Sequence, residues 1–176
     1  MIFAALECRS SRQGESEWFA IGVGARNGEP KDTGRNLQQG RDFVINLVSQ
    51  DLLQQMSVTA VDFDSSVNEL AEAGLEALPS VKVAPPRIKA SPVAYECVTE
   101  HVHDLGGNRS IVIARVVAMH IHDDVMLDRD RLYVDTPALG LVGRMHAGMW
   151  YSLQTNLLEM HRITETEHRG RSIKRT

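Results

Sequence analysis

The polar stretch KDTGRN lies between a glycine-containing turn and an apolar run. Thr33 and Asn36 are three residues apart, which places them on one face of a helix. The first N–H groups of a helix are unpaired and lie at the positive end of its dipole, so Thr33 and Lys31 would add a hydroxyl and a cation to a potential anion site. Asp32 would repel a phosphate and is expected to cap the helix or pair with Arg35. The residue types leave two interpretations open: a phosphate site, or a plain capped helix.

Four histidines form two His-x-His pairs, which are His101/His103 and His120/His122. Each pair shares one face of a strand, because residues two apart point the same way. A turn at Gly106 and Gly107 would place His101 opposite Val112, eight residues before His120. At about 3.3 Å per residue, the two pairs would then lie roughly 26 Å apart. One pair supplies only two ligands, so we expect strand-end histidines and no metal site.

Other catalytic motifs are missing from the sequence. It contains no P-loop, no G-x-S-x-G and no H-E-x-x-H. The glycines of GVGARNG differ by one residue from the dinucleotide-binding spacing, and Pro30 follows where a helix should run. The two cysteines, Cys8 and Cys97, have no His or Cys at zinc-site spacing and fit a reducing compartment. Hydrolase and nucleotidase mechanisms therefore have no motif to support them.

The elements around the KDTGRN stretch follow from apolar spacing and turn residues. Residues 18–23 and 42–48 are predicted strands, with Asn46 a hydrogen-bonded structural amide in the second. A short helix between them is expected to begin near Asp32 or Thr33 and to stop at Gly40.

Two further helices and a long hairpin are expected after this region. The first helix has Ser49 as its N-cap, and the second has a capping box of Ser66 and Glu69 and ends at Gly74. Two long β-rich runs, 91–105 and 109–124, form one antiparallel hairpin. Strands of this length coil strongly, which favours a barrel over a flat sheet.

Composition indicates a soluble globular protein of one domain. The chain has 176 residues, of which 43% are hydrophobic and 24% charged, and its net charge is -4. We therefore expect no affinity for nucleic acid, no membrane segment, and a cytoplasmic location. The basic residues 153–176 are expected to form a disordered tail.

In order along the chain, five segments resemble the flavin reductase-like proteins with an FMN-binding split barrel, a family often associated with flavoprotein oxygenases. They are PKDTGRN with DFVINLV, VDFDSSVNELAEAGLEALPS, APPRIKASPVAYEC, the hairpin through VVAMHIHDDV, and GRMHAGMWY. The resemblance implies a mainly β, Greek-key split barrel over residues 18–152, usually as a homodimer with FMN near the subunit interface.

The resemblance also implies site residues. In similar proteins the K-D-T-x-x-N segment lies at the flavin phosphate and ribityl chain, which here corresponds to Lys31, Asp32, Thr33 and Asn36. The final GR…G..Y segment corresponds to Arg144, Gly148 and Tyr151, near the flavin or the dimer contact.

The implied activity is hydride transfer from NADH or NADPH to flavin, with reduced flavin passed to a possible flavoprotein monooxygenase. Such chemistry belongs mostly to the cofactor, so the protein mainly positions it. Relatives usually have two more strands before the position of Trp18, including an N-x-A-P-[FY]-S segment, and residues 1–17 contain no such segment. Because of this difference, a second interpretation is that the protein is a non-catalytic flavin-binding or structural module. Loss of the two strands would also leave one strand of the barrel with an unpaired edge. A third interpretation is an FMN-dependent oxidoreductase acting on another small substrate.

Overall fold

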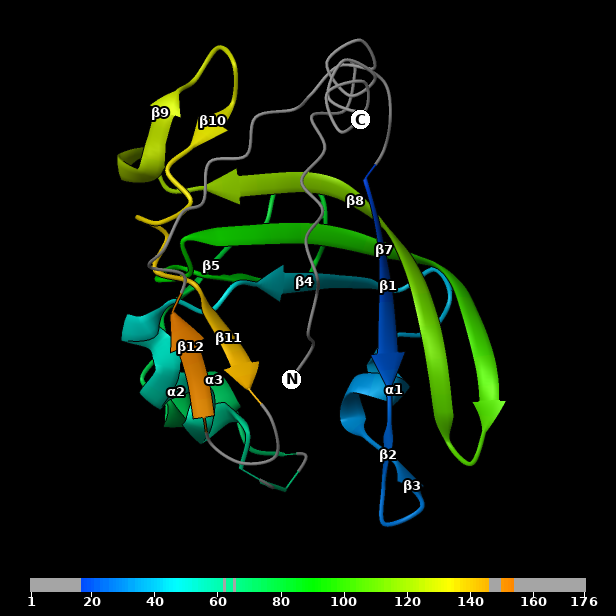
Figure 1. The fold of residues 1–176 in the computed structure, drawn as a ribbon. Coiled ribbons are helices and arrows are strands. Elements are labelled where there is room, and N and C mark those ends of the chain that lie inside the picture. Colours follow the sequence, from blue (N-terminus) through cyan, green and yellow to red (C-terminus); the bar gives the residue numbers. More distant parts are fainter. Residues whose placement is uncertain (1–16, 62, 65, 146–149, 154–176) are drawn as a thin grey trace, which may run out of the picture.

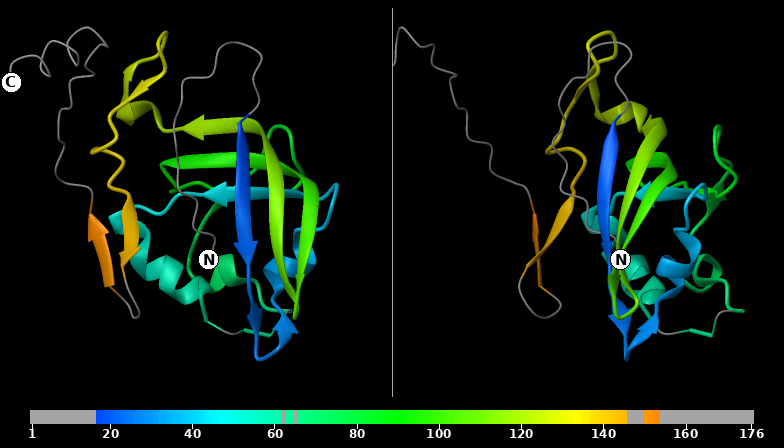
Figure 2. Two further views of the ribbon diagram at one scale, coloured as in Figure 1. Left: turned by 45° about the vertical axis from the view of Figure 1, so that its right-hand side comes forward. Right: turned by 90° about the vertical axis from the view of Figure 1, so that its right-hand side faces the viewer.

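The computed structural model describes residues 17–61, 63–64, 66–145 and 150–153, which form a mainly β protein with a few short helices. At its centre is one antiparallel sheet whose strands lie in the order β1 (Trp18–Val23), β8 (Arg109–Ile121), β7 (Val93–Gly106) and β4 (Asp42–Asn46). Figures 1 and 2 show the long β7–β8 hairpin bending along its length, so that the sheet curls into a half-barrel. The predicted mainly β fold and the predicted hairpin are confirmed.

The apolar core lies on the concave side of this sheet. Along β1, Ile21 points inward and is 1% exposed, whereas Trp18 points outward and is 53% exposed. This alternation is expected of a strand with one buried face. The buried cluster consists of Ile21, Val23, Leu37, Phe43, Ile45, Val93, Tyr95, Cys97, Val112, Ala114, Val125 and Leu139.

The turn of the β7–β8 hairpin differs from the prediction by one residue. Gly106 pairs with Arg109, so the two turn residues are Gly107 and Asn108, with φ values of 60° and 56°. Two consecutive residues with positive φ are typical of a type I′ turn, whose twist matches that of the two strands it joins. This turn, together with an irregularity in the pairing between Asp104 and Gly106, places His101 opposite Ile113 and not opposite the predicted Val112.

The two histidine pairs lie toward opposite ends of the hairpin. His101 and His103 are near its turn, while His120 lies opposite Ala94 at the start of β7. Among the described residues, no three His, Cys, Asp or Glu side chains are grouped closely enough to hold a metal ion.

The helices are short, and two of their predicted boundaries were wrong: the end of the first helix at Gly40 and the cap of the third at Ser66. Helix α1 (Asp32–Asn36) begins where expected but ends before Gly40, although Gly40 does have a positive φ of 75°. Ser49 occupies the predicted N-cap position, before the 3-10 helix η1 (Gln50–Leu52) that leads into α2 (Leu53–Thr59), although its side chain makes no capping hydrogen bond.

Helix α3 (Glu69–Glu72) is capped by Asn68 and not by the predicted Ser66. The Asn68 side chain accepts hydrogen bonds from the N–H groups of Leu70 and Ala71. Ser66 instead bonds to Asp64. Asparagine caps a helix as well as serine does. Asn68 is the cap here because it directly precedes the first helical residue, Glu69. The predicted end at Gly74 agrees with its positive φ of 64°.

The remaining elements are small, and most of them pair as two-stranded hairpins. They are β2 (Ala25–Arg26) with β3 (Glu29–Pro30), β5 (Ala77–Leu78) with β6 (Arg87–Ile88), β9 (Met126–Asp128) with β10 (Tyr133–Val134), β11 (Val142–Met145) with β12 (Trp150–Leu153), and the 3-10 helix η2 (Asp123–Val125). The expectations for residues 1–16 and 154–176 lie outside the described residues. No helix in the described part of the chain is long and apolar enough to cross a membrane.

Candidate functional site

Helix α1 is fixed to the half-barrel by one residue within it, Gly34, and by the residue that directly follows it, Leu37. Leu37, directly after the helix, is 3% exposed and belongs to the core cluster. Gly34 approaches β1 closely, because a Cβ atom at this position would lie 3.4 Å from Val23 Cγ1. The helix therefore packs through its Gly34–Leu37 side, which leaves Lys31 exposed and Thr33 half-buried.

The start of α1 presents backbone N–H groups that no side chain caps. Lys31 occupies the N-cap position in an extended conformation, without a side-chain capping hydrogen bond. Asp32 turns to Arg35, with 2.8 Å between Oδ1 and Nη1, and both side chains are exposed. Of the two predicted roles for Asp32, pairing with Arg35 is thus the one found. An uncapped helix start beside a lysine and a threonine hydroxyl suits an anion.

The predicted site residues do not all lie together. Lys31, Asp32, Thr33 and Asn36 share one helix, with Asn36 exposed in its last position. Arg144 lies in β11, exposed and opposite Tyr151 of β12. In both Figures 1 and 2, β11 is well separated from α1. One chain therefore does not bring Arg144 to the start of α1, and Gly148 lies outside the described residues.

A second polar cluster, centred on Glu96, was missed by the sequence reasoning. Glu96 is 0% exposed and lies on the outer face of β7. Its two carboxylate oxygens accept hydrogen bonds from the N–H groups of Val81 at 2.8 Å and Lys82 at 2.6 Å. His120 Nε2 of β8 lies 2.5 Å from Glu96 Oε1. The signal for it was a single carboxylate inside the otherwise apolar run PVAYECV.

Glu96 belongs to a row of side-chain acceptors that holds residues 79–90 against the sheet, and we name these residues the covering segment. Asn46 Oδ1 accepts from the Ile88 N–H at 2.9 Å, and Asp42 Oδ2 accepts from the Ala84 N–H at 3.4 Å. The segment contains three prolines and forms only a two-residue strand, so side chains replace the missing sheet partners. The predicted structural role of Asn46 is confirmed.

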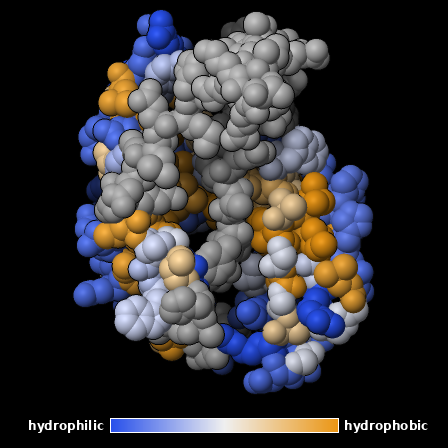
Figure 3. All heavy atoms as spheres, in the orientation of Figure 1, coloured by the Kyte–Doolittle hydropathy of each residue, from blue (hydrophilic) through white to orange (hydrophobic). Residues whose placement is uncertain are grey.

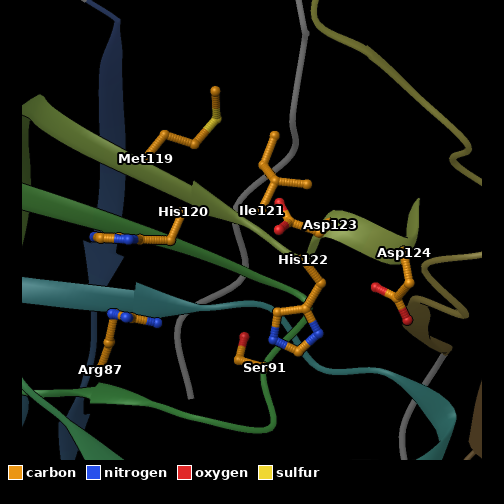
Figure 4. A pocket seen from close by; sticks show the side chains of 8 residues that line it. All are labelled: Arg87, Ser91, Met119, His120, Ile121, His122, Asp123 and Asp124. Carbon is orange, nitrogen blue, oxygen red and sulfur yellow. The ribbon is translucent and has the colours of Figure 1, made fainter. Parts of the chain in front are cut away.

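Next to this cluster is a depression of about 600 Å³. Figure 4 shows Arg87 and His120 on one side of it and His122, Asp123 and Asp124 on the other. Several of these groups already have partners: Asp123 pairs with Arg129 at 2.8 Å, and His122 Nε2 lies 3.1 Å from the Lys89 carbonyl oxygen. As a whole, the depression is lined by charged groups of both signs and does not define one class of ligand.

The charge of Glu96 makes folding stability depend on pH. Burial raises the pKa of Glu96, but the hydrogen bonds from Val81, His120 and Lys82 outweigh burial and hold this pKa below its ordinary value. A lowered folded-state pKa adds stability above the unfolded-state pKa of about 4.3, and this stability is lost as pH falls through the folded-state value. Urea unfolding between pH 3 and 7 should show this loss, with a shallower slope in Glu96→Gln. Parallel curves for the two proteins would contradict it.

Comparison with known proteins places this geometry in context. Residues 18–137 match the family model described as flavin reductase like domain. An uncharacterized protein of Deinococcus radiodurans is 34% identical over 146 residues, which cover 83% of this chain and 63% of that protein. The chain thus spans less than two thirds of the length of this relative.

Solved structures give the same fold. Nitrilotriacetate monooxygenase component B from Bacillus cereus is 25% identical, with a TM-score of 0.72 over 81% of this chain and 71% of that chain. A Shewanella frigidimarina protein with a split-barrel domain is 20% identical, with a TM-score of 0.69 over 83% of this chain and 71% of that chain, and this likeness concerns the fold alone. The predicted split-barrel fold is confirmed.

Proposed function

Because the chain belongs to the flavin reductase-like domain family, we propose that it binds FMN and transfers hydride to it from NADH or NADPH. When bound, the flavin supplies the hydride-accepting ring, and the protein supplies binding, orientation and electrostatics. The chain covers only 63% of the Deinococcus relative. Its substrates and partners are therefore proposed together with its activity.

The observation that supports flavin binding most directly is the uncapped start of α1. Its free N–H groups, the Lys31 ammonium and the Thr33 hydroxyl can together neutralise and orient a phosphate. The Asp32 carboxylate is held by Arg35 at 2.8 Å, which partly neutralises a charge that would repel the phosphate. In this proposal Asn36 contacts the ribityl chain from the far end of the same short helix.

A homodimer fits the separation of Arg144 from α1. Because β11 and α1 lie apart in one chain, Arg144 would reach a flavin phosphate or ring only at a contact between two copies. The solved relative from Bacillus cereus is component B of a monooxygenase. A flavoprotein monooxygenase that receives reduced flavin is accordingly the proposed partner, in a cytoplasmic setting.

Thr33→Ala tests the phosphate site. We expect this variant to bind FMN about tenfold more weakly, a loss of about 1.4 kcal/mol, because one hydrogen bond to a charged group is removed. Riboflavin, which has no phosphate, should bind as it does to the unaltered protein. Flavin fluorescence titration measures both affinities, and Thr59→Ala in α2 is a matched control. Equal losses for FMN and riboflavin would remove Thr33 from this role.

Nicotinamide oxidation separates the enzyme from a flavin-binding module. Purified protein with FMN should oxidise NADH or NADPH, followed by the decrease in nicotinamide absorbance. FMN binding without oxidation of either nucleotide would favour the non-catalytic module. No FMN binding at micromolar protein would contradict both.

A further inference from the structure

Arg87, at one end of the depression beside the Glu96 cluster, has a guanidinium without a partner. Its Nε atom is buried and makes no hydrogen bond. Among the described residues, no carboxylate forms an ion pair with this guanidinium. A buried donor that lacks an acceptor costs free energy, and such donors are commonly satisfied by a bound group. The Arg87 end of the depression is therefore more specific than the depression as a whole.

The backbone on both sides of Arg87 is fixed, which holds its side chain at this end. Arg87 pairs with Leu78 of β5, and the N–H of the next residue, Ile88, donates to Asn46 Oδ1 at 2.9 Å. The nearby carboxylate of Glu96 is already engaged by three other donors, two backbone N–H groups and one imidazole. Arg87 is therefore held in place without an acceptor from the described part of the chain.

The negative charges around the depression limit the charge of a ligand. Figure 4 shows Asp123 and Asp124 on the side opposite Arg87, and Asp123 pairs with Arg129 at 2.8 Å. Glu96 keeps its charge in the neighbouring cluster, because its hydrogen bonds hold its pKa below the ordinary value. One unpaired guanidinium balances one negative charge, and a second charge on the ligand would be repelled by these carboxylates. The arrangement favours a monoanion over a dianion.

Apolar side chains from the end of β8 form another wall of the depression. Met119 is 48% exposed and Ile121 is half-buried, and both line the depression. Figure 3 shows apolar residues gathered over β1 and β8. The volume of about 600 Å³ is within the range of small-molecule sites, which combine apolar walls with a few polar groups. A ligand at this position has room for an apolar body beside its charged group.

We propose that the depression binds a small monocarboxylic acid, with its carboxylate on Arg87 and its apolar body against Met119 and Ile121. The planar guanidinium presents paired N–H groups that match the two oxygens of a carboxylate. Inorganic phosphate is a poorer match, because it is largely a dianion at neutral pH and has no apolar body. The end of β8 lies away from α1 in Figures 1 and 2, so this site is separate from the proposed flavin site and does not depend on it.

Benzoate is the probe for this site, added to flavin-free protein whose methionine methyl groups carry ¹³C. We expect a saturable shift of the Met119 methyl resonance, assigned with Met119→Leu, and a Kd of about 1 mM. The resonance of Met145, in β11, should not shift. Benzyl alcohol has the same ring without the charge and should bind at least about tenfold more weakly. No saturable shift of Met119, or equal binding of benzyl alcohol or inorganic phosphate, overturns the proposal.

Three variants test the residues, with benzoate affinity measured by saturation-transfer NMR. Arg87→Met removes the charge and its donors and should weaken benzoate at least about tenfold. Lys89→Met is the matched control, because this cation of the covering segment pairs with Glu76 at 2.7 Å, and it should leave the affinity unchanged. Met119→Glu places a carboxylate at an exposed position of the wall and should also weaken benzoate about tenfold. An unchanged affinity in Arg87→Met, or in Met119→Glu if Arg87→Met does not fold, overturns the proposal.

Discussion

Replacing Glu96 with alanine should lower the free energy of unfolding by about 2–4 kcal/mol, because it removes a fully buried carboxylate and leaves the part-buried donors around it without their acceptor. The N–H groups of Val81 and Lys82 lose the only side-chain acceptor that the structure gives them, and His120 loses its contact with Glu96 Oε1. The covering segment would then be held by Asn46 and the weaker contact from Asp42. Urea unfolding at pH 7 measures the change.

Glu96→Gln is the matched control for this prediction. It keeps the shape and one acceptor oxygen but loses the charge, so about half of the destabilisation is expected. Glu100→Ala removes a carboxylate from the same strand whose ion pair with Arg115 is only half-buried, and it should cost less than about 1 kcal/mol. Equal stability of Glu96→Ala and Glu100→Ala would contradict a special role for the buried carboxylate.

The fold was accessible from the sequence wherever one local signal dominated. Alternating apolar residues located the strands of the sheet, and glycine with asparagine located the turn of the β7–β8 hairpin. The turn was still misplaced by one residue, because Gly106, Gly107 and Asn108 all tolerate a positive φ. Similarly, Ser66 and Asn68 are both suitable N-caps, and only the position of Glu69–Glu72 in space selects Asn68.

The candidate site was accessible only in part, for a different reason. The KDTGRN segment is local, so its helix start followed from residue types, whereas both capping and pairing with Arg35 remained open for Asp32 until the structure showed the ion pair. The cluster around Glu96 joins three distant parts of the chain: β7, β8 and the covering segment. Spacing along the sequence carries no information about such a contact. The one available signal, a carboxylate inside an apolar strand, indicates a buried partner without identifying it.

The thiol of Cys97 should be protected from Ellman's reagent in the folded protein, at least about a thousandfold relative to the unfolded chain. Burial, and then the nearby charge of Glu96, raises the pKa of Cys97 to about 12, so very little thiolate forms at pH 8. Cys97 is also 0% exposed, which denies the reagent access. Labelling in a Cys8→Ser background should therefore follow unfolding and be faster in Glu96→Ala, where the unfolded population is larger. Rapid labelling of Cys97 at pH 8, in the folded protein with Glu96 intact, would contradict the predicted protection. If labelling in Glu96→Ala were as slow as with Glu96 intact, Glu96 would not stabilise the sheet around Cys97.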